Sequence, residues 1–128
     1  MLLPTVNEII EVNKKVLDRL EPHEVVNRNN LESLLAAFEY YETDNVFHIA
    51  GILLWKISKA HAFRQGNKRT AVVVTLTFLN SYEIEIERNT REDWDNDQLY
   101  ELSLRIAKGE VKDVDSGSEL TKALNKYV

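Results

Sequence analysis

Apolar and polar positions along this 128-residue chain alternate mainly at the spacing of amphipathic helices. Over residues 5–20, apolar side chains recur at steps of three and four, which predicts a first helix. Thr5 and Glu8 have the pattern of a capping box at its start. Pro22 interrupts the pattern, and the polar residues around it predict a loop.

Two further helices are predicted before the middle of the chain. Asn29 or Asn30 is expected to cap one that continues to Phe38. Asp44 is expected to cap the next, whose apolar residues form one stripe that ends at His61. These helices would present their apolar faces to a common core.

The segment from Thr70 to Leu79 is apolar nearly all round, so periodicity alone permits a buried helix or a strand. Residues 81–87 alternate between apolar side chains and glutamates, which predicts a short strand or an extended flap.

Two more helices are predicted near the end of the sequence. Residues 96–109 form one that Gly109 closes, and Ser116 or Ser118 starts a last short one. We therefore expect an all-α fold, a compact bundle of five or six helices with at most a short strand, in a single domain over residues 1–128.

Composition narrows the classes of partner. The 16 Lys and Arg against 21 Asp and Glu give a net charge of -5, which opposes broad binding to nucleic acid or to an anionic membrane. The longest apolar run, residues 71–79, is about half of the ~20 residues that a membrane-spanning helix needs. The start lacks the pattern of a secretory signal peptide, so we expect a cytoplasmic protein.

The stretch HAFRQGNKRTA, residues 61–71, places polar residues between two of the most apolar segments. If the second segment is a helix, Asn67, Lys68 and Arg69 form its first turn, where backbone N–H groups and the helix dipole attract anions. Gly66 permits close approach to the backbone, and the two cations suit phosphate oxygens. The pattern predicts a di- or triphosphate site.

His61 precedes this site by only a few residues, so its imidazole can lie beside a bound phosphate. Histidine exchanges protons near neutral pH, and we interpret His61 as a general base for phosphate transfer. Taken alone, each feature has a structural alternative: His61 as a structural histidine, and the Lys68–Arg69 pair as a solvated helix end.

His23 and His48 lack ligands at metal-binding spacing, and we interpret both as surface residues. Trp55 is assigned to peripheral packing.

The motif resembles the signature of the Fic/Doc superfamily, and its form NKRTA is most similar to the Doc (death on curing) branch of toxins. The flanking stretches VVNRNNLESLLAAFEYYE, HIAGILLWKISKAHAF and LTFLNSYEIEIE also resemble that branch. The resemblance implies a helical domain whose central helix begins just after the motif. It assigns His61 as catalytic base, Phe63 as a structural anchor, and Gly66, Asn67, Lys68 and Arg69 as nucleotide phosphate ligands.

Two departures from the family pattern affect the expected chemistry. Lys68 stands where enzymes that transfer AMP have a second glycine, and this resemblance implies transfer of the terminal phosphate of ATP. Gln65 stands where the family has an acidic ligand for Mg²⁺, so the metal site should be weakened. Transfer of AMP and a catalytically silent nucleotide-binding module stay open as alternatives.

Resemblance to Doc further implies particular partners. The target would be a threonine of elongation factor Tu, with arrest of translation as the result. A separate antitoxin would inhibit the toxin through a helical C-terminal segment. Two segments are candidates for receiving the target: the exposed edge of the predicted strand over residues 81–87, by strand addition, and the loop over residues 21–30, as a flap.

Overall fold

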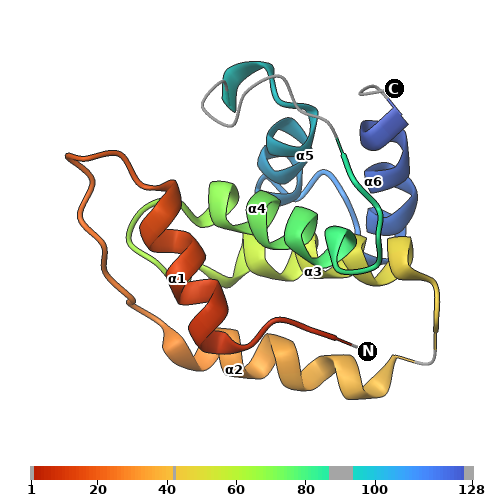
Figure 1. Ribbon diagram of the computed structural model, residues 1–128, viewed down its shortest axis with the longest axis horizontal. Coiled ribbons are helices and arrows are strands. Elements are labelled where there is room, and N and C mark those ends of the chain that lie inside the picture. Colours follow the sequence, from red (N-terminus) through yellow and green to blue (C-terminus); the bar gives the residue numbers. More distant parts are fainter. Residues whose placement is uncertain (1, 42, 87–93, 126–128) are drawn as a thin grey trace.

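The computed structural model describes residues 2–41, 43–86 and 94–125, and in these ranges the chain forms six α-helices and no strand (Figure 1). Short 3-10 turns follow α2 and precede α5 and α6. The helices are α1 (Val6–Val16), α2 (Arg28–Ala36), α3 (Val46–Ala60), α4 (Asn67–Asn80), α5 (Gln98–Ala107) and α6 (Ser116–Asn125). The expected all-α class and helix number are confirmed.

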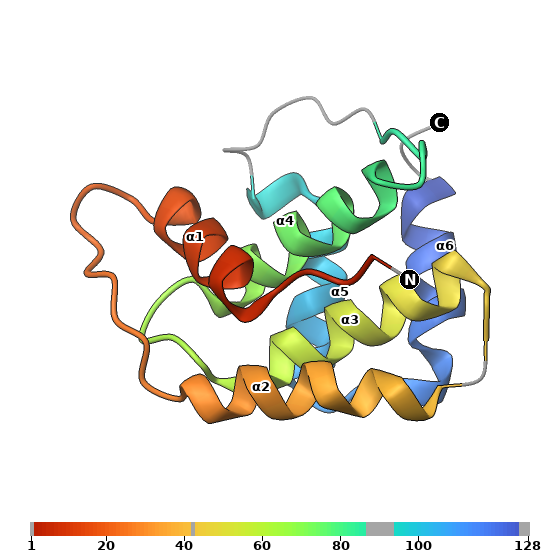
Figure 2. The ribbon, with the colours of Figure 1, turned by 60° about the horizontal axis from the view of Figure 1, so that its bottom comes forward.

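The helices pack around α3, which contacts α2, α4, α5 and α6 (Figures 1 and 2). α4 runs beside α3 and is covered by α1 and α5. The expectation of a buried central helix is confirmed with one change, since the most widely contacted helix precedes the motif and does not follow it. The motif therefore joins the two helices at the middle of the bundle.

Small residues allow α3 to approach α6 closely. A Cβ added at Gly51 would lie 2.5 Å from the backbone nitrogen of Gly117. Ser58 in α3 and Ser103 in α5 are both buried and share a hydrogen bond of 2.6 Å. Close packing and satisfied polar groups thus both fix the position of α3.

Helix α4 resolves the ambiguity of the apolar run after the motif. Its residues Thr70, Ala71, Val72 and Val74 are buried between neighbouring helices. This burial outweighs the β propensity of valine and threonine. No helix in the described ranges is both long enough and apolar enough to span a bilayer.

Several helix boundaries differ from the sequence-based expectations. α1 ends at Val16 and not near residue 20, although Thr5 and Glu8 do form the expected capping box. Asn45 caps α3 in place of Asp44, because its side-chain oxygen accepts from the first-turn N–H groups. Neither predicted asparagine caps α2, which begins at Arg28.

The predicted strand near residue 82 does not form over the described residues 81–86. Tyr82, Ile84 and Ile86 are nevertheless half-buried while Glu83 and Glu85 are exposed, so the alternation correctly predicts the two faces. Glu87 lies outside the described residues. At the end of α5, Gly109 adopts the expected left-handed conformation with φ of 80°.

Candidate active site

The motif loop, residues 61–66, joins the C-terminus of α3 to the N-terminus of α4. His61 caps α3 with φ of 49° and ψ of 41°, and its side chain is exposed. This left-handed conformation is uncommon for a residue other than glycine and turns the chain sharply out of the helix. His61 is thus placed at the surface, at the start of the motif loop.

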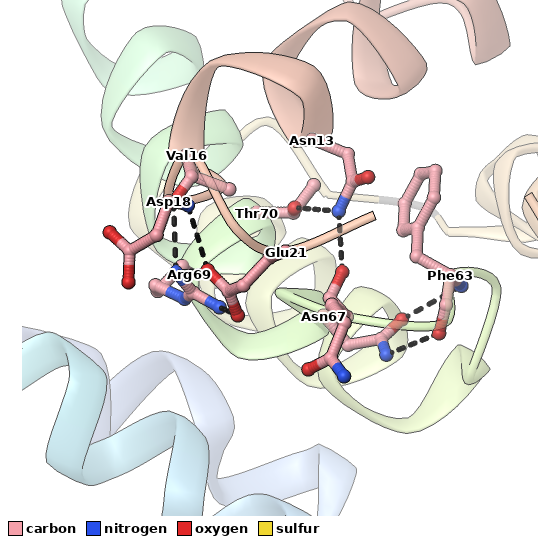
Figure 3. Close-up of polar contacts among 9 residues, drawn as sticks. Asn13, Val16, Asp18, Glu21, Phe63, Asn67, Arg69 and Thr70 are labelled. Carbon is pink, nitrogen blue, oxygen red and sulfur yellow. Dashed lines mark hydrogen bonds and ion pairs between the residues drawn. The ribbon is translucent and has the colours of Figure 1, made fainter. Parts of the chain in front are cut away.

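Phe63 and Asn67 hold the two ends of a short turn within the motif. Phe63 is buried, with 3% of its surface exposed, which agrees with its predicted role as an anchor. The Asn67 side chain accepts from the Phe63 N–H (3.0 Å) and donates to the Phe63 carbonyl oxygen (2.7 Å) (Figure 3). The Asn67 amide therefore shapes the loop, which is a role that the sequence pattern did not indicate.

Asn13 in α1 holds the motif loop from the side and is completely buried. Its amide nitrogen donates to the Gln65 carbonyl oxygen (2.8 Å) and to Thr70 Oγ1 (3.1 Å) (Figure 3). Its oxygen lies 2.8 Å from His23 Nδ1. Because an amide oxygen only accepts, His23 donates from Nδ1 in this arrangement.

The loop after α1, over residues 24–27, also contacts the motif loop. The N–H groups of Val26 and Asn27 both donate to the Ala62 carbonyl oxygen, at 2.8 and 3.1 Å. The Arg64 N–H donates to the Glu24 carbonyl oxygen (3.0 Å), and Val25 forms an isolated antiparallel bridge with Phe63. The loop after α1 therefore pairs with the motif backbone (Figure 1).

Gly66 is the N-cap of α4 and lies in the left-handed region, with φ of 76°. A Cβ at this position would lie 3.0 Å from Leu17 Cδ2 and 3.3 Å from Asn13 Nδ2. The positive φ favours glycine here, and an added Cβ would also press against the side chains of Leu17 and Asn13. The α-carbon of Gly66 packs against the end of α1. This packing does not support the predicted close approach of a phosphate to Gly66.

Arg69 points from the first turn of α4 toward the end of α1. Its Nη1 donates to the Val16 carbonyl oxygen (2.9 Å) and to Glu21 Oε1 (2.8 Å), and its Nη2 donates to Glu21 Oε2 (2.6 Å) (Figure 3). The side chains of Arg69 and Glu21 are 14% and 22% exposed. The structure thus pairs the arginine with a carboxylate.

The ion pair shifts the pKa of both partners. Hydrogen bonding from Arg69 and from the Asp18 N–H lowers the pKa of Glu21 from 4.5 to about 2. The same carboxylate raises the pKa of Arg69. Both groups are therefore charged at neutral pH, and their charges compensate each other.

The first turn of α4 retains the features expected of an anion site. Gly66 offers no side-chain cap, and the first helical N–H bond of α4 runs from Thr70 to the Gly66 oxygen (2.9 Å). The half-buried side chain of Lys68 makes no hydrogen bond or ion pair with any residue in the described ranges. These N–H groups and this ammonium are suited to phosphate oxygens.

The residues around the motif do not fit a metal ion held by the protein. Gln65 supplies a neutral amide, and the nearby carboxylates of Glu21 and Glu24 face Arg69 and Arg64. Within the described parts of the chain, no three His, Asp or Glu side chains gather as metal ligands. Because a hard dication favours charged oxygen ligands, this set of side chains offers it little attraction.

Comparison with protein families agrees with this arrangement. Residues 4–79, from the start of α1 almost to the end of α4, match the Fic/DOC family. The chain belongs to this family. The match contains the whole motif loop and all of the α1 residues that support it. A comparison with curated proteins gives no match.

Family membership supports a nucleotide-dependent transferase in general terms, and the roles of single residues stay predictions.

Sequence analysis identified the motif but missed Asn13 and Glu21, which hold it. A buried asparagine on the apolar stripe of α1 was a usable signal for the first. His23, interpreted as a surface residue, is exposed but bonded to Asn13. Trp55 packs as expected, donating to the Val111 carbonyl oxygen.

Proposed function

We propose that this Fic/DOC protein is a Doc-like toxin that transfers the terminal phosphate of ATP to a hydroxyl group of another protein. One observation carries the proposal: the fixed motif loop has exposed His61 at one end and the uncapped first turn of α4, with Lys68, at the other. A proton acceptor and an anion site are thereby held a short distance apart along a single rigid connection.

The chemistry requires one bond to form and one to break. The target oxygen attacks the terminal phosphorus as its proton passes to His61. The bond from phosphorus to the bridging oxygen breaks, and ADP leaves with the electron pair. The first-turn N–H groups and Lys68 stabilise the charge on the phosphates. Magnesium would enter with ATP as part of the substrate.

Several hydrogen bonds support this function because they limit the motion of the loop. Asn13, Asn67 and the segment over residues 24–27 all hold the backbone between His61 and α4. Transfer depends on the position of the base relative to the phosphate, so a loop fixed in advance lowers the barrier. The arrangement has the properties of a preorganised site.

The choice of phosphate and of partners rests on the Doc resemblance. Lys68 in place of a glycine favours transfer of the terminal phosphate over transfer of AMP. The proposed target is a threonine of elongation factor Tu, which places the protein in the cytoplasm. The proposed inhibitor is an antitoxin with a helical C-terminal segment.

The test is the intact mass of elongation factor Tu after incubation with ATP, Mg²⁺ and the protein. We expect a gain of one phosphoryl group with the parent and none with His61→Asn, a variant that tolerates the left-handed backbone. His48→Gln, at the other end of α3, is the matched control and should retain transfer. A gain of AMP would establish the alternative transferase, and unmodified factor would reject this target.

Gln65 favours a second candidate function, a nucleotide-binding module without catalysis. The neutral amide removes the carboxylate that would attract Mg²⁺. If this reading is right, Gln65→Glu creates a transfer activity that the parent lacks. Equal activity of parent and variant would reject it.

A further inference from the structure

We propose that Arg69 is a positioning residue, held by Glu21 as a strut between α1 and α4, and that Lys68 is the side-chain cation that meets the phosphate. The strut is independent of what the protein catalyses. The role of Lys68 rests on the proposed function.

The first support is that the Arg69 guanidinium is already bound by other groups of the protein. Three hydrogen bonds of 2.6 to 2.9 Å engage it, two with Glu21 and one with the Val16 carbonyl oxygen. A bidentate pair of a guanidinium and a carboxylate fixes both the distance and the orientation of the two groups. Only 14% of the Arg69 side chain is exposed, so a phosphate would have to displace a carboxylate to bind there.

The second support is the end of α1. Val16 is the last residue of this helix, and its carbonyl oxygen has no partner further along the helix. Arg69 supplies a charged donor to that oxygen. The contact satisfies a carbonyl oxygen left free where α1 ends, and it ties the end of one helix to the start of another.

The third support is the division of α4 into two faces. A Cβ at Gly66 would lie 3.0 Å from Leu17, Thr70 bonds to Asn13 and Arg69 bonds to Val16, so these three positions share the side of α4 that faces α1. Figure 3 shows the contacts of Thr70 and Arg69. At 100° per residue, Lys68 lies on the far side of the helix from this face. The two neighbouring cations therefore have separate surroundings.

Electrostatics distinguish the two cations in the same way. The charge of Arg69 is compensated by Glu21, whose low pKa keeps it ionised throughout the physiological range. Lys68 has no compensating carboxylate within the described residues. A phosphate approaching the first turn of α4 therefore meets the ammonium of Lys68, whose charge no carboxylate in the described parts of the chain compensates.

The test compares five variants in two measurements, the dissociation constant of ATP with Mg²⁺ by calorimetry and the melting temperature. Lys68→Met should weaken ATP binding about tenfold or more and leave melting unchanged. Lys122→Met in α6, an exposed lysine that pairs with Glu119 at 3.5 Å, is its matched control. Glu21→Gln should lower the melting temperature and change ATP affinity by less than about twofold.

A charge exchange tests the strut directly. Arg69→Glu should lower the melting temperature strongly, and the double variant Glu21→Arg with Arg69→Glu should recover most of that loss. The double variant should also bind ATP about as well as the parent, which a glutamate among phosphate ligands would not permit.

Three results would overturn the proposal. One is tighter ATP binding by Glu21→Gln, which would make Arg69 a phosphate ligand that Glu21 blocks. Another is a double variant that melts no higher than Arg69→Glu. The third is a Lys68→Met variant that keeps the parent's affinity. A parent that binds no ATP would reject the proposed function, and the melting temperatures would still decide whether Arg69 is a strut.

Discussion

The side chain of Asn13 in α1 donates a hydrogen bond to the backbone carbonyl oxygen of Gln65, across 52 positions of sequence. The same amide reaches Thr70 and His23, so it connects α1 with the motif loop, with α4 and with the loop after α1. All of its hydrogen-bonding groups face partners in a fully buried setting. The motif is therefore held by a residue outside it.

Asn13→Leu tests this connection, since leucine fills a similar volume without the hydrogen bonds. The variant leaves the Gln65 carbonyl and the Thr70 hydroxyl without this donor, and we expect the free energy of unfolding to fall by about 2 to 4 kcal/mol. Urea unfolding measures the loss, and amide exchange should become faster in residues 61–66. Asn7→Leu on the exposed face of α1 removes only an exposed hydrogen bond from Arg28 (3.2 Å) and is the control, with a change within about 0.5 kcal/mol. A similar small change for Asn13→Leu would contradict the assignment.

Glu21 predicts a specific dependence of stability on pH. Its pKa is lowered from 4.5 to about 2 in the folded protein, so the ion pair stabilises the fold above about pH 4.5. This contribution is lost as pH falls from 4.5 toward 2, because the unfolded chain binds the proton first. Glu21→Gln should thus cost about 2 kcal/mol at pH 7 and little at pH 2, measured by urea unfolding.

Glu24 offers a matched control for that measurement. Its pair with Arg64 spans 3.6 Å between exposed side chains, and such pairs contribute little. Glu24→Gln should change stability by less than about 0.5 kcal/mol at either pH. A Glu21→Gln deficit that stays constant between pH 7 and pH 2 would show that the ion pair is not its source.

The left-handed backbone of His61 predicts an order of stability among variants. Glycine adopts φ of 49° without strain, asparagine tolerates it, and alanine resists it. His61→Gly should exceed His61→Ala by about 1 kcal/mol in thermal unfolding, with His61→Asn between them. An alanine variant as stable as the glycine variant would mean that this conformation is not kept in solution. The order also explains the choice of asparagine for the activity test.

The contact between α3 and α6 predicts that Gly51→Ala is severely destabilising. Helix propensity alone would favour alanine by about 1 kcal/mol. The new methyl group would instead lie 2.5 Å from the Gly117 nitrogen, and we expect a loss of about 3 kcal/mol or more in chemical unfolding. Gly109→Ala has open space and only an unfavourable φ, so its loss should stay near 1 kcal/mol. Similar losses for the two variants would contradict the close contact.

Local sequence determined the helical class and most of the helices. The stripes of α3 and α5, the capping box at Thr5 and the left-handed Gly109 depend on residues within a few positions of one another. Spacing at steps of three and four reports directly on one face of a helix. The motif over residues 61–71 was equally visible, because a glycine and two cations before an apolar run occur within one turn.

The tertiary structure decided how the motif is held. Glu21 and Arg69 are 48 positions apart, and no local pattern indicates that one neutralises the other. Arg69 also bonds to Val16 at the end of α1, although the apolar periodicity continues beyond that residue. Burial between α1, α3 and α5 likewise stabilises the valines of α4 in a helix and not in a strand. The physical reason is that helix periodicity is a property of neighbouring residues, whereas the partner of a charge depends on how distant helices pack.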